Sequence, residues 1–132
     1  MRVFVDTNVL VAAIATRGLC EDLLRAVLAA HELVVSDQVL LEMERVLTTK
    51  LGVPADVVAE AVEFLREHEV VPSPRGRPQI DVRDPDDVPI LAAAIEAGVD
   101  VLVTGDADLL EVAGESPVPI VTPRELWSRL RA

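Results

Sequence analysis

Four acidic residues stand at places in the chain from which they could converge on one site. They are Asp6, Glu42, Asp87 and Asp106. Asp6 ends the apolar run at 3–5 and Asp106 follows the apolar run at 101–103, so both look like strand ends. Acids at the carboxyl edge of a parallel sheet point into one crevice, where their charges repel unless cations neutralise them. Mg²⁺ and Mn²⁺ favour such oxygen ligands, so the constellation indicates a metal-dependent hydrolase.

The first two acids each have an ordinary structural interpretation beside the chemical one. Asp6 fits the N-cap of a helix, but Thr7 and Asn8 could cap equally well, and three polar side chains are more than a cap requires. Glu42 has apolar neighbours at helical spacing, which fits an inward position. Glu44 has such neighbours too, so periodicity does not choose between the two glutamates. For either one, the alternative is a solvated helix residue.

The other two acids lie in acidic clusters. Asp87 stands beside Asp84 and Asp86 just before an apolar helix, and one of these three fits its N-cap. The helix dipole favours the others, but capping does not explain them. Asp106 and Asp108 follow a strand-like run and a glycine, a composition that is also typical of an ordinary turn. Alone, this second cluster is a weak signal.

Strand-like apolar runs alternate with segments of helical periodicity, a pattern that favours βαβ units and a parallel sheet. The predicted strands are 2–5, 33–35, 69–71, 101–103 and 118–121. The predicted helices have apolar stripes within 19–28, 39–47, 57–65 and 90–95, and a short helix follows Pro123. Gly98 is placed to end the fourth helix, and Ser36 or Asp37 to cap the second. The proline-rich segment 72–89 is a loop of a length that is often functional.

The composition fits a single domain over residues 1–132, with 51% hydrophobic residues for a core. No apolar run approaches the roughly 20 residues that span a membrane, and no signal-peptide pattern is present. Cys20 is the only cysteine, which excludes an internal disulfide, so a cytoplasmic location is the default expectation.

The net charge of −11 argues against tight binding of nucleic acid through overall charge. It does not exclude a nucleic-acid substrate, because bound metal would cancel part of the charge and arginines could supply local contacts. These arginines are Arg17, Arg75, Arg77 and Arg83. Solvated loop residues are an equal alternative for them.

Taken together, these segments resemble the PIN-domain ribonucleases, especially the VapC-like toxins of bacterial and archaeal toxin–antitoxin pairs. The resemblance covers nearly the whole chain through four stretches in the family's order: VFVDTNVL, SDQVLLEMERVL, DPDDVPILAAAIEAG and VLVTGDADLL. Each stretch alone is weak, and four in order are specific. The resemblance implies a three-layer α/β/α domain with a five-stranded parallel sheet. It also implies an acidic, Mg²⁺- or Mn²⁺-dependent site that cleaves RNA.

On that resemblance, the catalytic and metal-binding residues are Asp6, Glu42, Asp87 and Asp106. Among the three clustered acids, Asp87 stands at the family's offset from the apolar helix. Asn8 and Thr104 match polar residues that support the site, and Asp108 matches less securely. The implied mechanism is phosphodiester hydrolysis assisted by one or two metal ions, with Glu42 ligating through water or orienting the nucleophile. An antitoxin partner and a homodimer are implied as well.

Two other functions fit parts of the pattern. Receiver domains and haloacid-dehalogenase-like phosphatases also place an Asp after the first strand of a parallel sheet, but both use a lysine from late in the sheet. Here the only lysine, Lys50, lies early, and Asn8 occupies the place of the phosphatases' second Asp. The other alternative is a binding module that has kept the fold and lost activity. The presence of all four acids argues against it.

Overall fold

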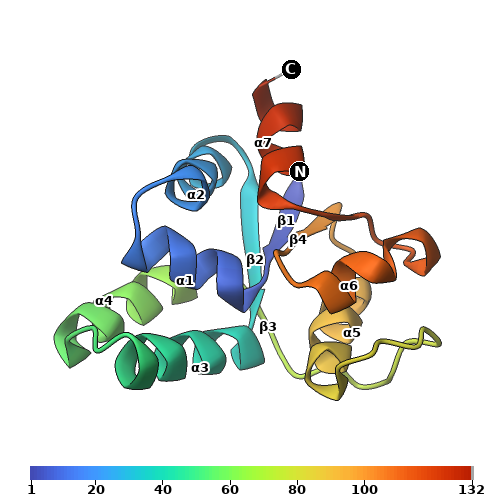
Figure 1. The fold of residues 1–132 in the computed structure, drawn as a ribbon, viewed down its shortest axis with the longest axis horizontal. Helices are drawn as coiled ribbons and strands as arrows, with labels where there is room; N and C mark the ends of the chain where they lie inside the picture. Colours follow the sequence, from blue (N-terminus) through green and yellow to red (C-terminus); the bar gives the residue numbers. More distant parts are fainter. Residues whose placement is uncertain (132) are drawn as a thin grey trace.

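The sheet is five-stranded and parallel throughout, in the order β3-β2-β1-β4-β5 (Figure 1). A computed structural model describes residues 1–131 of the chain. The strands are β1 (Arg2–Val5), β2 (Glu32–Ser36), β3 (Glu69–Val71), β4 (Val101–Val103) and β5 (Ile120–Val121). β1 is central, with its Val3 paired to Leu33 of β2 on one side and to Val101 of β4 on the other. The predicted α/β fold with a five-stranded parallel sheet is confirmed.

Helices cover both faces of this sheet. They are α1 (Thr7–Ala15), α2 (Leu19–Ala30), α3 (Asp37–Arg45), α4 (Ala55–Arg66), α5 (Val88–Ala97), α6 (Ala107–Glu111) and α7 (Pro123–Arg131). A π-helical segment, Val46–Lys50, continues α3, and 3-10 turns lie at Pro85–Asp87 and Ala113–Glu115. Figure 1 shows α1 to α4 on one side of the sheet and α5 and α6 on the other, which gives the three layers. α7 packs against α2.

The connections change sides of the sheet between β1 and β4. The chain leaves β1 through α1 and α2 on one face, and it reaches β4 through α5 on the opposite face. At such a switch point the carboxyl ends of the two strands leave a crevice, where ligands bind in open α/β sheets. Asp6 directly follows β1 and Thr104 directly follows β4, so the strand order places both at this crevice.

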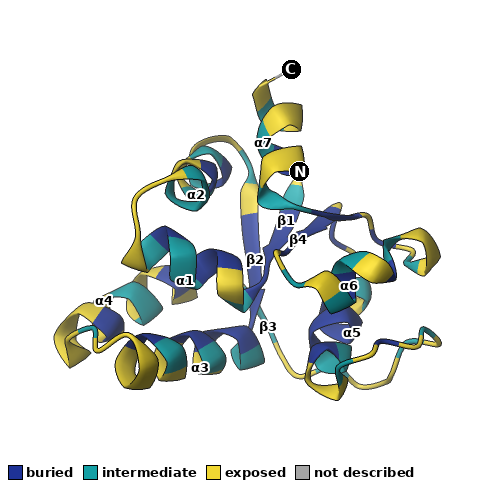
Figure 2. Cartoon of the chain, in the orientation of Figure 1, coloured by how far each residue is buried: buried dark blue, intermediate teal, exposed yellow. Residues whose placement is uncertain are grey.

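The strands are buried on both faces, as their continuous apolar runs predict (Figure 2). β4 is buried along its whole length, and β1 is buried over residues 3–5. α5 is buried over residues 90–94 and ends at Gly98. The φ of Gly98 is 63°, a left-handed conformation that glycine adopts without a steric penalty. One continuous core therefore holds the strand ends that carry the acids.

Three elements differ from the prediction. β5 covers only 120–121 instead of 118–121, because Pro117 and Pro119 lack the N–H groups that a longer strand would donate. Periodicity predicts neither α1 nor α6. α1 is apolar along most of its length and is packed against both α2 and α3, so no amphipathic pattern marks it. α6 has five residues, too few for a period to emerge.

Two predicted details of the connections are confirmed. Ser36 caps α3, since its hydroxyl accepts a 3.2 Å hydrogen bond from the backbone N–H of Val39. The segment after β3 is a loop that ends in the 3-10 turn Pro85–Asp87 and leads directly into α5. Within residues 1–131, no helix combines the length and the apolar character needed to cross a membrane.

Candidate active site

Asp6 is fixed at the junction of β1 and α1. Its side chain is 4% exposed, and it caps α1 by accepting a 2.7 Å hydrogen bond at Oδ1 from the backbone N–H of Thr7. The other oxygen, Oδ2, accepts a 2.7 Å hydrogen bond from the hydroxyl of Thr104. Asp6 therefore fulfils the ordinary capping role and also faces β4 across the switch point.

Asn8 and Thr104 join the end of β1 to the end of β4. The amide nitrogen of Asn8 donates to Oδ2 of Asp6 at 3.4 Å, and its amide oxygen accepts from the backbone N–H of Gly105 at 3.0 Å. The hydroxyl of Thr104, which donates to Asp6, also accepts a 2.9 Å hydrogen bond from the backbone N–H of Asp106. These two side chains thereby fix the positions of both aspartates.

Glu42 approaches the same site from α3. Its Oε2 accepts a 3.0 Å hydrogen bond from the hydroxyl of Thr7, and its Oε1 accepts a 2.9 Å bond from the side-chain amide of Gln38. Glu44, the competitor that periodicity left open, is exposed to solvent. The packing of α3 against α1 therefore selects Glu42 as the inward glutamate.

Asp87 and Asp106 complete the group. Asp87 immediately precedes α5 and is 9% exposed, and its Oδ2 is buried with no hydrogen-bond partner in the described part of the chain. Asp106 caps α6 by accepting a 2.8 Å hydrogen bond at Oδ1 from the backbone N–H of Asp108. A buried carboxylate oxygen without a hydrogen bond raises the free energy of the folded state, so the position of Asp87 does not serve stability.

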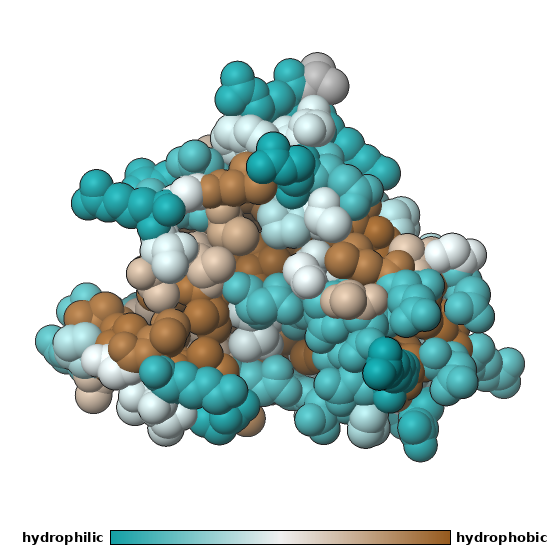
Figure 3. Space-filling view, in the orientation of Figure 1, coloured by the Kyte–Doolittle hydropathy of each residue, from teal (hydrophilic) through white to brown (hydrophobic). Residues whose placement is uncertain are grey.

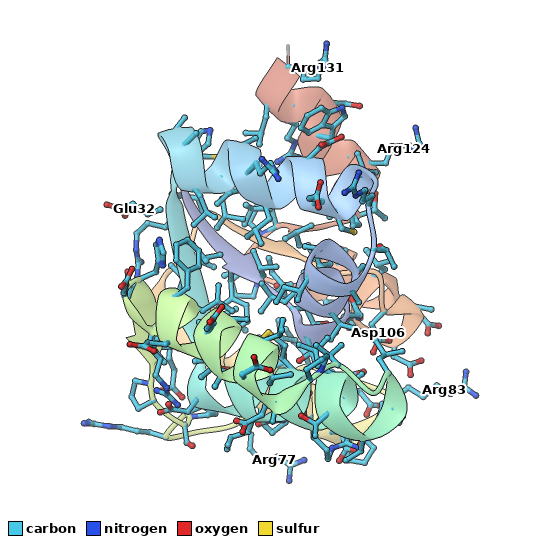
Figure 4. The ribbon with its side chains drawn as sticks, turned by 90° about the vertical axis from the view of Figure 1, so that its left-hand side faces the viewer. Glu32, Arg77, Arg83, Asp106, Arg124 and Arg131 are labelled. Carbon is cyan, nitrogen blue, oxygen red and sulfur yellow. The ribbon has the colours of Figure 1, made fainter. Side chains whose placement is uncertain are left out.

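The four predicted acids line a single pocket of about 340 Å³. Thr7 and Asn8 line it as well, together with apolar residues of α1 and of the π-helical segment and its C-cap: Val11, Ala12, Ala15, Val46 and Leu51. No lysine or arginine is among the lining residues within the described chain. In Figure 4 the labelled arginines Arg83 and Arg77 lie below Asp106 in the view and extend outward.

A second acidic group overlaps the first at Asp87. One carboxylate oxygen from each of Asp84, Asp87 and Asp108 lies within 4.8 Å of the others. Asp84 also caps the 3-10 turn by accepting from the backbone N–H of Asp86 at 2.9 Å. Asp86 itself is exposed. The three clustered acids thus separate into one that caps, one that points outward and one, Asp87, that is common to both groups.

The electrostatics of the site reflect this crowding of carboxylates. Burial raises the pKa of Asp6 above its ordinary value, and the hydrogen bonds from Thr104 and Thr7 oppose the rise. Burial also raises the pKa of Asp87 to about 8, assisted by the neighbouring carboxyl of Asp106, with which a protonated Asp87 can share its hydrogen. A divalent cation would relieve both conditions, since it supplies positive charge and takes the orphaned oxygen as a ligand. The donor set therefore fits a hard cation.

The hydrogen-bonding roles of Thr7 and Gln38 are not evident from sequence reasoning. Thr7 stands beside Asp6 and fits a simple cap, but it contacts a glutamate that lies 35 positions further along the chain. Gln38 carries a signal that was available, because it precedes Glu42 by one helical turn and such pairs can interact.

Comparisons with known proteins agree with this fold. A family model of the PIN domain matches residues 2–108. A chain of the VapBC2 complex from Rickettsia felis, bound to a promoter DNA fragment, is 17% identical with a TM-score of 0.65, covering 92% of this chain and 98% of that one. A PilT N-terminus domain protein from the archaeon Sulfolobus solfataricus is 14% identical with a TM-score of 0.60, covering 98% and 93%.

The PIN domain endonuclease Utp24 is 22% identical, with a TM-score of 0.55 and a coverage of 92% of this chain and 84% of that one. No match was found among curated protein sequences. At these identities the structural likenesses show the fold, and the match to the family model extends over most of the chain.

Proposed function

The chain belongs to the PIN-domain family, and from that premise we propose that it is a metal-dependent endoribonuclease that hydrolyses RNA phosphodiester bonds. PIN domains are typically nucleases, and the fold is shared with the PIN domain endonuclease Utp24. The observation that carries the proposal is the convergence of four carboxylates on one pocket that no lysine or arginine of residues 1–131 lines. A divalent cation would neutralise the clustered carboxylates of such a pocket, and it could also bind a phosphate group of the substrate.

The residues that would hold Mg²⁺ or Mn²⁺ are Asp6, Asp87 and Asp106, with Glu42 as a direct or water-mediated fourth. A bound divalent cation would polarise the phosphodiester and lower the pKa of the attacking water. One carboxylate oxygen each from Asp84 and Asp108 lies within 4.8 Å of one from Asp87. That second group supports a role for Asp108 in the site.

The protein's own groups hold the carboxylates in place. Thr104 and the N–H of Thr7 each bind a different oxygen of Asp6, so the carboxylate cannot rotate freely. Thr7 and Gln38 hold Glu42 in the same way, one hydrogen bond to each oxygen. These hydrogen bonds fix the orientation of the carboxylates before the substrate binds. A preorganised site of this kind lowers the activation free energy because it does not have to rearrange during the reaction. The apolar residues that line the pocket, among them Val11 and Leu51, offer no hydrogen-bonding side chains to water there.

We extend the proposal to biological context on the family's properties. The chain is proposed to be a single-domain cytoplasmic toxin (residues 1–132) that pairs with an antitoxin and forms a homodimer. The structural likeness to a chain of a VapBC complex supports the partner. Large apolar residues exposed on α3, α4 and the segment between them support a protein-binding surface: Leu41, Leu51, Val57 and Phe64. Figure 3 shows hydrophobic residues gathered over this end of the molecule, at the lower left.

The phosphotransfer alternative gains no support from the site. Lys50 is exposed at the end of the π-helical segment and does not line the acidic pocket. The chain's only lysine is therefore not placed to bind a phosphoryl group beside Asp6.

The test is cleavage of labelled RNA with Mg²⁺, with Mn²⁺ and with EDTA, using wild type and Asp6→Asn in parallel. We expect cleavage in either metal, none in EDTA, and none with Asp6→Asn, which removes a charge but little volume. Circular dichroism of the variant verifies that the fold is kept. DNA of the same sequence measures the preference for RNA. Full activity in Asp6→Asn, or cleavage that survives EDTA, would refute the proposed site.

A further inference from the structure

A second pocket, of about 460 Å³, lies beside the acidic one. It is formed mainly by the loop between β3 and α5 and by the start of α5, and Gln38 of α3 belongs to its wall. Arg75, Arg77 and Ser73 are among the residues that line it. The lining thus includes two arginines, a serine and a glutamine, and no acidic residue within the described chain.

Gln38 connects the two pockets. Its side-chain amide donates to Glu42 in the acidic pocket at 2.9 Å and to the backbone carbonyl of Asp86 at 3.4 Å. Asp86 belongs to the same 3-10 turn that delivers Asp87 to the acids. Gln38, which lines one pocket, is thus hydrogen-bonded to Glu42, which lines the other, so the two pockets are neighbours.

The loop that carries the arginines is anchored to α5. The carboxylate of Glu96 accepts hydrogen bonds from the backbone N–H of Arg75 at 2.8 and 3.0 Å and from that of Gly76 at 3.0 Å. These bonds lower the pKa of Glu96 and keep it charged. Further along, Val82 is buried in the core. Because the loop is held at both places, its arginine side chains extend from a fixed backbone; Figure 4 shows Arg77 reaching outward.

Arg75 and Arg77 are not held in salt bridges within the described chain, although the positive charge of Arg75 contributes to the lowered pKa of Glu96. The salt bridges within residues 1–131 use Arg2, Arg25 and Arg66. In a protein with a net charge of −11, binding a polyanion through overall charge is unfavourable, so local cations must supply the attraction. Planar guanidinium groups match phosphate oxygens in geometry as well as charge.

Stacking of bases on aromatic side chains can contribute little to binding an RNA strand here. Only 2% of the residues are aromatic, and none of them lines either pocket in the described chain. Single-stranded nucleic acids are ordinarily held by aromatic platforms together with basic grooves. With the platforms missing, the strand must be held through its phosphates.

We propose that the pocket of Arg75 and Arg77 binds a phosphodiester group of the RNA strand, adjacent to the one that lies at the four acids. This inference rests on the proposed function, since it names how the same site holds its substrate. The acids with their cation would take the scissile phosphate, and the loop arginines would take a neighbouring phosphate. Recognition at this subsite is by the backbone, so it tolerates any base.

The test compares the double variant Arg75→Ala/Arg77→Ala with Arg129→Ala/Arg131→Ala, which removes the same charge from exposed positions on α7. Binding of a labelled single-stranded oligoribonucleotide is measured by fluorescence anisotropy with Mg²⁺, in an Asp6→Asn background that keeps the strand intact. For the loop variant we expect Kd to rise about tenfold and the slope of log Kd against log salt to fall by about 0.7, the value for one phosphate on a single strand. Arg75→Lys/Arg77→Lys should keep the salt slope.

Cleavage kinetics give the second readout. In the background with Asp6 intact, the loop variant should raise KM with little change in kcat, because the lost contact is to substrate and not to the reacting atoms. Unchanged binding and KM in the loop variant, or equal weakening in the α7 variant, would overturn the subsite. Those outcomes leave wild-type cleavage intact. Failure of the proposed function would instead appear as no metal-dependent cleavage by wild type.

Discussion

The hydroxyl of Thr104 donates a 2.7 Å hydrogen bond to Oδ2 of Asp6, although 98 positions separate the two residues. The same hydroxyl accepts from the backbone N–H of Asp106. One oxygen atom at the end of β4 therefore orients two of the four acids at once. Because Thr104 is fully buried, no water replaces it if the hydroxyl is removed.

Thr104→Val should weaken both activity and stability. The substitution keeps the shape but leaves the Asp106 N–H without a partner and leaves Oδ2 of Asp6 with only the 3.4 Å hydrogen bond from Asn8, at a cost of about 1–3 kcal/mol in unfolding free energy. Loss of an outer-shell partner of this kind lowers metal affinity or activity by roughly 10–100-fold. Chemical denaturation and RNA cleavage measure the two effects. Thr104→Ser, which keeps the hydroxyl, is the matched control, and equal losses in both variants would contradict the role of the hydroxyl.

Glu42→Gln should reduce cleavage while its neighbour tolerates the same change. Glu42 faces the acidic pocket and Glu44 is exposed. Removing the charge of Glu42 takes an anionic oxygen from the site proposed for the cation, so we expect at least about a tenfold loss of activity. Glu44→Gln should be near wild type in the same assay. If the two variants behave alike, the inward position of Glu42 has no functional meaning.

Asp87→Asn should stabilise the metal-free protein and abolish cleavage. The buried Oδ2 of Asp87 has no partner in the described chain, and its carboxyl faces Asp106. An amide in its place donates to that carboxylate and removes a like charge. We expect the Tm in EDTA at pH 8 to rise by about 3 °C or more. Sites that trade stability for function behave in this way. Asp86→Asn, at an exposed position, serves as control, and a lower Tm for Asp87→Asn would contradict the electrostatic interpretation.

Stability of the metal-free protein should fall as pH rises. The pKa of Asp87 is about 8 in the folded chain against an ordinary value of 3.8, so between these values the folded state holds a proton that the unfolded state has lost. A state that binds more protons is favoured at low pH, and its advantage disappears as pH rises through about 8. Differential scanning fluorimetry in EDTA from pH 5 to 8.5 measures the slope. Asp87→Asn should flatten it, and a slope unchanged by that variant would contradict the assignment.

Metal affinity should show the opposite trend. A cation must displace the proton from Asp87, so Mg²⁺ binding should tighten with rising pH until about pH 8 and then level off. Calorimetry in two buffers of different ionisation enthalpy detects the released proton. Binding that is independent of both pH and buffer would show that Asp87 is not a ligand.

Much of the fold was predictable because parallel strands buried on both faces require continuous apolar runs, and the chain has such runs at 3–5 and 101–103. The sequence also marks Asp6 and Asp106 as following those strands. Once the sheet is parallel, their arrival at one edge needs no further information. α1 was not predicted, because a helix that packs on several sides is apolar all round and shows no helical periodicity of apolar residues.

The choice among neighbouring acids depended on contacts between distant segments. Glu42 and Glu44 have similar local surroundings, and only the contact with Thr7 of α1 shows which one faces the pocket. Asp84, Asp86 and Asp87 differ in direction because a 3-10 turn aims each one differently, and nothing in local propensity fixes that geometry.

Strand periodicity and chain order are local properties, and together they predict that acids meet at the carboxyl edge of a parallel sheet. Contacts between distant segments select which acids meet, which oxygens are held and which one has no partner in the described chain. These depend on hydrogen bonds between residues up to 98 positions apart, and on burial, which raises the free energy of a charge only when other segments exclude water from it.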